Sequence, residues 1–206
     1  MFQKSDDKLS SCGDITPFMV KVESFYISKF EITEDIWGRV MGDYNNVFKN
    51  SKKPITNISW FDLLIFIKKI NNRTNKNYRI PSSVEWEYAA RGGKKTNHYK
   101  FSGSNNLNEI SWNQWNSNDS VHEVGLKKPN ELDIYDMSGN VWEFTSKYDS
   151  GSAIIKDFSN YTDWYCIKGG CFLSPEKKYY DVAYSLLNKE YYEKSKYIGI
   201  RLILDN

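Results

Sequence analysis

The stretch that decides the fold runs from Tyr78 to Gly93 and reads YRIPSSVEWEYAARGG. Ser82 is a favoured N-cap residue, and Glu85 three positions further on completes a capping box, so a helix is expected to begin here. Gly92 follows the final turn, where a residue in the left-handed conformation commonly ends a helix. The stretch therefore predicts one short helix with a defined start and a defined end.

Two further helices are predicted upstream of this stretch. Thr33 is the N-cap of the first helix, and Gly42 ends it. Ser59 is the N-cap of the second, and the apolar residues that follow it cover most of its circumference, so we expect this helix to be largely buried. Residues 24–32 are rich in aromatic and β-branched side chains and predict a strand.

The rest of the chain predicts irregular structure followed by strands. Residues 93–140 show no sustained period, but Trp115 and other aromatic anchors indicate an ordered region and not a disordered linker. Strands are predicted at residues 141–145, 164–168 and 198–204, each bounded by turn residues. Because helices come first and strands last, we expect a loop-rich α+β domain with two to three helices and a short antiparallel sheet.

Composition and charge exclude two classes of partner. The chain has 206 residues and a formal net charge of +2, which is too balanced for the basic footprint of a nucleic-acid-binding domain. No stretch approaches the ~18 consecutive apolar residues that a membrane helix needs. We therefore expect no nucleic-acid partner and no membrane span.

Several motifs follow one another in a distinctive order. They are PITNISW at residues 54–60, YRIPSSVEWEYAARGG at 78–93, KPNEL at 128–132, IYDMSGNVWE at 134–143, KGG at 168–170 and GIR at 199–201. Together they resemble the formylglycine-generating enzyme (sulfatase-modifying factor) superfamily. The resemblance implies a variant of the C-type-lectin fold over residues 18–206, with residues 1–17 as an N-terminal tail.

The resemblance also locates the catalytic positions. Family enzymes that oxidise a peptidyl cysteine hold copper(I) with two cysteines, five residues apart, that follow the Gly-Gly turn; soft thiolates suit this soft ion. Carried onto residues 168–170, this pattern places the two positions at Ser174 and Tyr179. A hydroxyl and a phenol are hard oxygen groups, so we expect no copper and no catalytic residue of this type.

Two cysteines elsewhere in this region share the same spacing. Cys166 and Cys171 bracket the Gly-Gly turn instead of following it. We expect two separate thiols, and Cys171 is the alternative nucleophile or metal ligand of an oxidoreductase with altered chemistry. A related branch of the superfamily binds iron through histidines, but His98 and His122 are the only histidines and lie in loops, so no iron is expected.

One metal site of the family is retained by residue type. The resemblance implies a structural calcium ion in the turn at residues 136–143, because calcium prefers hard oxygen ligands. The implied ligands are the carboxylates of Asp136 and Glu143 and the backbone carbonyls of Gly139 and Val141.

The favoured function is a non-catalytic module that binds a protein or a surface ligand. Residues 171–197 mix tyrosines with short polar residues, as paratopes do. The tyrosines assigned to ligand binding are Tyr179, Tyr180, Tyr184, Tyr191 and Tyr192. The segment also aligns with the hypervariable tract of the variable proteins of diversity-generating retroelements. The alternatives are a protein-modifying oxidoreductase with altered site chemistry and a regulatory partner of a paralogous enzyme.

The residues near the start of the chain leave two locations open. As written, the sequence has no apolar segment before Cys12 and predicts a cytoplasmic protein. The small residues around Cys12 resemble the site at which bacterial lipoproteins are cleaved and acylated. An exported lipoprotein is therefore the alternative if the start is truncated.

Overall fold

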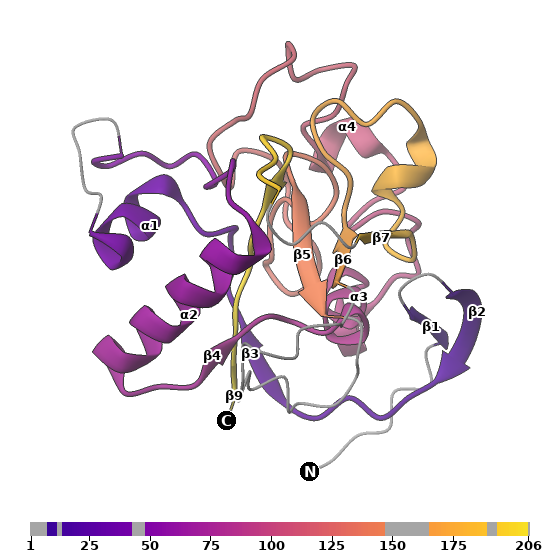
Figure 1. Ribbon diagram of the computed structural model, residues 1–206. Coiled ribbons are helices and arrows are strands. Elements are labelled where there is room, and N and C mark those ends of the chain that lie inside the picture. Colours follow the sequence, from indigo (N-terminus) through magenta and orange to yellow (C-terminus); the bar gives the residue numbers. More distant parts are fainter. Residues whose placement is uncertain (1–7, 12–13, 43–47, 147–164, 189–192, 206) are drawn as a thin grey trace.

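Three capped helices form where the sequence predicts them. The computed structural model describes residues 8–11, 14–42, 48–146, 165–188 and 193–205. The helices are α1 (Glu34–Met41), α2 (Trp60–Thr74) and α3 (Ser83–Ala90). Both α2 and α3 begin with a complete capping box, and α1 and α2 pack against each other at one side of the molecule (Figure 1).

Two small sheets organise the remainder of the fold. In the first, β9 (Ile203–Asp205) lies between β3 (Phe25–Ile27) and β4 (Tyr78–Arg79), antiparallel to both. The second has the order β7 (Ser185–Asn188), β6 (Tyr165–Lys168), β5 (Trp142–Ser146) and β8 (Ile198–Gly199). Its pairs are antiparallel except for β5 and β8, which are parallel.

Two of the strands are shorter than the sequence predicts. Residues 24–32 contribute only β3, and residues 198–204 divide into β8 and β9. Between β8 and β9 the backbone stays paired, because Ile32 N donates to Ile200 O at 2.8 Å and Ser28 N donates to Leu202 O at 2.9 Å. The ladder is interrupted where the side chain of Arg201 enters the interior.

The segment expected to be an N-terminal tail contains a strand pair. β1 (Lys8–Ser11) and β2 (Asp14–Met19) are antiparallel, and β1 lies against α3. The prediction of a tail over residues 1–17 is therefore wrong for this part. The sequence signal was weak because the pair is short and irregular, with a register shift between Leu9 and Ser11.

The long irregular region is ordered, as predicted, and is held to α3 by one buried side chain. It contains two short helical turns, η1 (Gly93–Lys95) and α4 (Leu107–Ile110). Asn130 Nδ2 donates to Ala89 O at 2.8 Å, and Asn130 Oδ1 accepts from the backbone of Leu132 at 3.0 Å. One amide thus joins the end of α3 to the loop.

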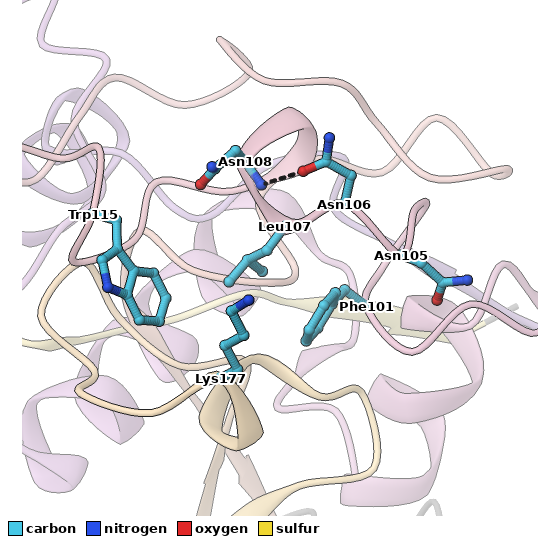
Figure 2. A pocket seen from close by; sticks show the side chains of 7 residues that line it. All are labelled: Phe101, Asn105, Asn106, Leu107, Asn108, Trp115 and Lys177. Carbon is cyan, nitrogen blue, oxygen red and sulfur yellow. Dashed lines mark hydrogen bonds between the residues drawn. The ribbon is translucent and has the colours of Figure 1, made fainter.

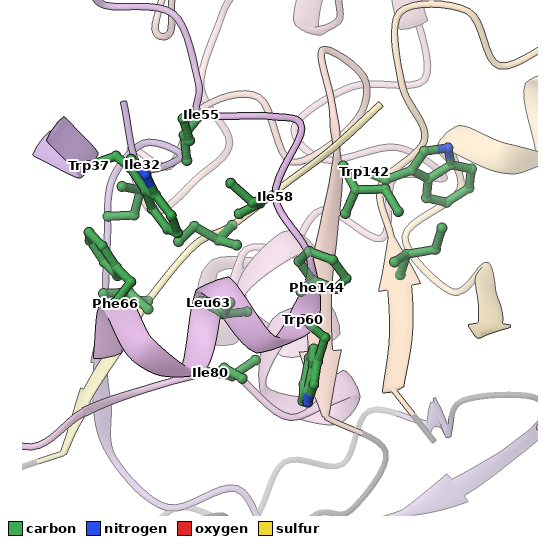
Figure 3. Packing of buried hydrophobic residues seen from close by; sticks show 14 of the residues in the cluster. Ile32, Trp37, Ile55, Ile58, Trp60, Leu63, Phe66, Ile80, Trp142 and Phe144 are labelled. Atoms are coloured by element: carbon green, nitrogen blue, oxygen red, sulfur yellow. The ribbon is translucent and has the colours of Figure 1, made fainter. Parts of the chain in front are cut away.

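The main core lies between α2 and the four-stranded sheet. Trp60 stacks on Tyr165 with ring centroids 4.9 Å apart. Trp37 stacks on Phe66 at 4.7 Å (Figure 3). Stacked pairs of this kind stabilise a core beyond the area they bury. A second cluster forms around Trp86 of α3. No helix in the described part of the chain combines the length and apolar composition that crossing a bilayer requires.

Candidate functional site

A groove opens at the positions that the family pattern marks as catalytic. Its volume is about 570 Å³, and Ser174, Tyr179 and Cys171 all line it. Trp142 at the start of β5 and Tyr197 before β8 also line it. The structure thus brings together residues that sequence reasoning placed at one site.

The Gly-Gly turn positions this groove. Gly170 has φ +76°, a left-handed conformation that favours glycine. A Cβ atom there would lie 2.9 Å from Tyr179 O and 2.9 Å from the Tyr180 ring, so the turn packs directly on η2 (Lys177–Tyr180). This close approach fixes Cys171 beside Ser174.

The hydroxyl of Ser174 contacts Cys171 and organises the loop. Ser174 Oγ accepts from Cys171 N at 2.9 Å and lies 3.5 Å from Cys171 Sγ. Burial raises the pKa of the Cys171 thiol, so the neutral thiol is favoured. A neutral thiol beside a hydroxyl is a poor copper(I) ligand and a weak nucleophile.

Lys168, the sequence-local cation that would activate Cys171, is directed elsewhere. Its ammonium is fully buried and lies 3.3 Å from Glu87 Oε2. Glu87 also pairs with Arg91 at 2.7 Å, as their i, i+4 spacing predicts. The ammonium of Lys168 therefore pairs with the Glu87 carboxylate on α3 and does not activate Cys171.

The two cysteines do not form a pair. Cys166 on β6 is disulfide-bonded, and its partner lies outside the described residues. Cys171 is a free thiol. The two cysteines are separate, as expected, but the expectation of a thiol is wrong for Cys166, because its sulfur is in a disulfide.

The predicted ligand-binding tyrosines divide into four groups. Tyr179 lines the groove, and its ring is 6.0 Å from Trp142. Tyr184 is not among the lining residues, but its ring lies 5.1 Å from that of Tyr179. Tyr180 is fully buried, which excludes direct ligand contact in this structure and corrects its assignment. Tyr191 and Tyr192 lie outside the described residues.

Tyr180 supports the groove from beneath. Its hydroxyl lies 2.9 Å from Ser174 O and 3.0 Å from Cys171 O, and it accepts from Gln114 N at 3.3 Å. Burial raises the pKa of Tyr180 to about 12, so the phenol remains protonated and donates to the loop. A count of tyrosines cannot distinguish this supporting role from a binding role.

The turn that the family uses for calcium is engaged by protein groups. Glu143 accepts from Trp86 Nε1 at 2.6 Å and from Arg201 at 2.8 Å. Its second contact to Arg201 occupies the same oxygen that faces Trp86, at 3.0 Å. Glu143 is therefore not available as a calcium ligand in this arrangement.

Two of the other predicted ligand residues, Asp136 and Gly139, also contact protein groups. Asp136 Oδ2 accepts from Gly125 N at 2.7 Å, while Oδ1 is buried without a hydrogen-bond partner. Gly139 N donates to Gly169 O at 2.8 Å, which uses this turn to support the Gly-Gly turn. Among the described residues no group of three or more His, Cys, Asp and Glu side chains could hold a metal ion. A calcium ion held by Asp136, Glu143 and the carbonyls of Gly139 and Val141 therefore stays a prediction, with Glu143 already engaged by Trp86 and Arg201.

The two histidines lie in different surroundings. His122 stacks on Trp112 with centroids 3.7 Å apart, and its Nε2 lies 2.7 Å from Ser117 O. His98 is exposed in a loop.

The sequence did not reveal that Arg201 is the buried partner of Glu143. Its place in the GIR motif was the available signal.

The fold and the groove define a domain of the sulfatase-modifying factor type. Residues 7–206 match the family described as the sulfatase-modifying factor enzyme 1-like domain, and the chain belongs to this family. The fold is the C-type-lectin-like fold expected from the sequence motifs.

Three known proteins illustrate the range of the likeness. The chaperone protein LppX of Paenibacillus barcinonensis is 31% identical over 205 residues, covering 75% of this chain and 71% of that protein. The inactive C-alpha-formylglycine-generating enzyme 2 of Bos taurus is 27% identical over 122 residues, covering 53% of this chain and 38% of that protein. The solved structure of Treponema denticola variable protein 1 matches with a TM-score of 0.80 at 22% identity, covering 100% of this chain and 93% of that one.

Proposed function

We propose that this chain is a non-catalytic binding module that takes a partner's polypeptide segment in the groove. The observation that carries the proposal is the pair Ser174 and Tyr179, which stand at the two positions matched to copper-binding cysteines and both line the groove. Oxygen groups at both positions remove the soft ligands that the oxidation needs. What remains is a groove lined mostly by apolar side chains, with Ser174 and Ser195 among the lining residues.

The walls of the groove suit side-chain capture. Tyr179, Tyr197 and Trp142 are rigid aromatic groups that offer contact area at a small cost in conformational entropy. Leu186 of β7 extends the wall and is partly exposed. The volume falls within the range of about 300–1,000 Å³ that holds small organic ligands, and also suits one or two side chains of a partner.

The proposal is tested by selection of short random displayed peptides on the purified chain. Selected peptides are expected to lose at least tenfold in affinity with Tyr179→Ala and to bind normally to Tyr26→Ala, an exposed tyrosine outside the groove. Selected peptides that bind both variants equally would place binding elsewhere and contradict the proposal.

A second measurement tests the absence of copper chemistry. The chain is titrated with copper(I) and then incubated with a cysteine-containing peptide and dioxygen. We expect no tight copper binding and no oxidation of the peptide. Tight binding that is abolished by Cys171→Ser would instead establish the alternative oxidoreductase.

A chaperone-like or regulatory partner is the second candidate function. It is favoured by the likeness to a protein named as a chaperone, LppX. Its test is suppression of the thermal aggregation of citrate synthase, a model client. Suppression by the wild-type chain, lost with Tyr179→Ala, would favour this candidate, and no suppression would count against it.

An origin as a diversity-generating retroelement variable protein is a further part of the binding proposal. It is supported by the tyrosine-rich segment at residues 171–197 and by the fold shared with a Treponema variable protein. The test is the coding DNA. A near-copy of this segment beside a reverse-transcriptase gene, differing only at adenines, is expected; its absence would remove this part of the proposal.

A further inference from the structure

A second pocket lies on the other side of η2 from the groove. Its volume is about 280 Å³, and it is lined by Phe101, residues 105–108, Trp115 and Lys177 (Figure 2). The helical turn η2 presents Lys177 to this pocket and Tyr179 to the groove. The two sites are thus separate.

The floor and one wall of this pocket are apolar. Phe101 and Leu107 are both buried, while Trp115 is 52% exposed. Figure 2 shows the side chain of Lys177 between the rings of Trp115 and Phe101, with Leu107 beyond it. A large exposed indole in a concave site offers a flat apolar face with an N–H group at its edge.

Trp115 is held in place by its surroundings. Its backbone N donates to Asn113 Oδ1 at 3.0 Å, and its ring lies 6.2 Å from the buried ring of Tyr180. Gln114 Nε2 donates to Pro175 O at 2.7 Å, which ties the tryptophan loop to the segment before η2. A wall fixed in this way costs little ordering entropy when a ligand binds.

Two asparagines at the pocket present amide N–H groups that have no partner in the described residues. Asn105 Oδ1 accepts from Lys100 N at 2.9 Å, and Asn108 Oδ1 accepts from Asn113 Nδ2 at 3.1 Å, which leaves the Nδ2 group of each residue to donate outward. The third, Asn106, is used within the protein, since its Nδ2 donates to Glu109 Oε1 at 3.0 Å. Within the same described ranges, Lys177 pairs with no carboxylate, unlike its neighbour Lys178, which pairs with Glu176 at 2.8 Å.

We propose that this pocket binds an acidic saccharide. A sugar ring stacks its apolar C–H face on Trp115, its hydroxyl oxygens accept from the amide groups of Asn105 and Asn108, and its carboxylate pairs with Lys177. The volume suits one or two sugar rings, since it lies just below the range of about 300–1,000 Å³ found for drug-sized ligands. This site goes beyond the proposed function, which uses the groove alone.

The test is ¹⁹F NMR on the full chain labelled with 5-fluorotryptophan. Trp115→Phe identifies the Trp115 resonance among the 7 tryptophans. The probes are the methyl glycosides of glucuronic and galacturonic acids, each paired with its neutral methyl glucoside or galactoside. We expect the Trp115 resonance to shift with at least one acid, with an apparent affinity at least fivefold above its neutral partner and in the millimolar range.

Variants separate the two contacts. Lys177→Gln is expected to remove the preference for the acid over its neutral partner. Trp115→Ala removes the labelled tryptophan, so its binding is followed by saturation-transfer difference NMR on the sugars, and we expect no transfer to the acid or to the neutral sugar. Lys178→Gln and Tyr26→Ala, an exposed lysine and an exposed tyrosine that do not line the pocket, are expected to leave binding unchanged.

Three results would overturn the proposal. The first is no Trp115 shift with either acid. The second is a shift of equal strength with acid and neutral sugars, which would remove the role of Lys177. The third is a Trp115 shift with adenosine 5′-monophosphate alone, which would assign the pocket to a nucleotide.

Discussion

Arg201 compensates three buried carboxylates at the centre of the molecule. Its Nη2 lies 2.8 Å from Glu143 Oε1, and it also donates to the backbone oxygens of Ser28 and Tyr135. Glu31 and Asp136 lie close enough for their charges to influence one another. One cation therefore faces three acidic groups, and the pKa values of two of them, Glu31 and Asp136, are raised.

We expect Arg201→Leu to be among the most destabilising changes in the chain. It leaves Glu143 buried without its partner, at a cost of about 3–5 kcal/mol in the free energy of unfolding. Urea denaturation measures this cost. Arg201→Lys keeps the charge but loses the planar guanidinium group, so its free energy of unfolding is expected to lie between those of the wild-type chain and Arg201→Leu. Lys128→Ala, which removes an exposed pair with Glu109, is the control and should change little. Equal losses of stability for Arg201→Leu and the control Lys128→Ala would contradict this account.

The protonation of Asp136 makes stability depend on pH. Burial raises its pKa from 3.8 to about 6, so the folded chain binds this proton more tightly than the unfolded chain. The contribution of this group is therefore most favourable below pH 4 and is lost as the pH rises through 6. Burial likewise raises the pKa of Glu31, with the charges of Asp136 and Glu143 adding to the shift, so Glu31 acts in the same direction.

Asp136→Asn is expected to stabilise the chain at pH 7.5 by on the order of 1–3 kcal/mol. The substitution keeps an acceptor for Gly125 N and removes the buried charge. Urea denaturation at several pH values, in buffer with EDTA, should show a gain that shrinks toward pH 4. Asp133→Asn, at an exposed position, is the control. A loss of stability at pH 7.5 would show that the carboxylate has a favourable partner there.

At the level of turns and helices, tight glycines decide where the chain bends. Gly139 has φ +99°, and a Cβ atom there would clash with Trp112 O and Ser111 Oγ. Gly42 at the end of α1 has φ +94°, but nothing lies within 4 Å of the same position. The two glycines share a backbone conformation and differ in the space around them.

This pair gives a matched test of crowding. Gly42→Ala is expected to cost about 1 kcal/mol, the usual penalty for a left-handed residue with a Cβ. Gly139→Ala adds a backbone clash and is expected to cost more than about 4 kcal/mol, in the range reserved for exceptional substitutions. Thermal unfolding of both variants measures the difference, and similar melting temperatures would mean that the turn at Gly139 relaxes freely.

For the molecule as a whole, the side-chain amide of Asn130 joins the irregular region at residues 93–140 to the end of α3. Asn130→Ala removes bonds to Ala89 O and to the backbone of Leu132 and leaves those groups buried or partly buried. We expect a loss of about 2–4 kcal/mol, because each unsatisfied buried group costs about 1–3 kcal/mol. Hydrogen exchange should become faster across residues 93–140. Asn97→Ala, at an exposed site, serves as the control, and unchanged exchange in Asn130→Ala would contradict the role assigned to it.

The predictable parts of this fold are those that local chemistry determines. The N-caps at Thr33, Ser59 and Ser82 identified three helices, since a cap depends on residues within one turn. The burial of Tyr180 and the pairing of Glu143 with Arg201 could not be predicted, because each depends on residues far apart in sequence. The acidic-sugar pocket was missed for the same reason, as Trp115 and Lys177 meet only in the folded chain.

The position of β9 in its sheet has a consequence for how the chain is made. This strand lies between β3 and β4, although both of them come more than a hundred residues earlier. A ribosome therefore releases β3 and β4 long before the strand that joins them exists, and both keep unpaired edges during synthesis. Nascent chains that stall before β9 should be prone to aggregate or to need a holdase, because open strand edges invite pairing with other chains.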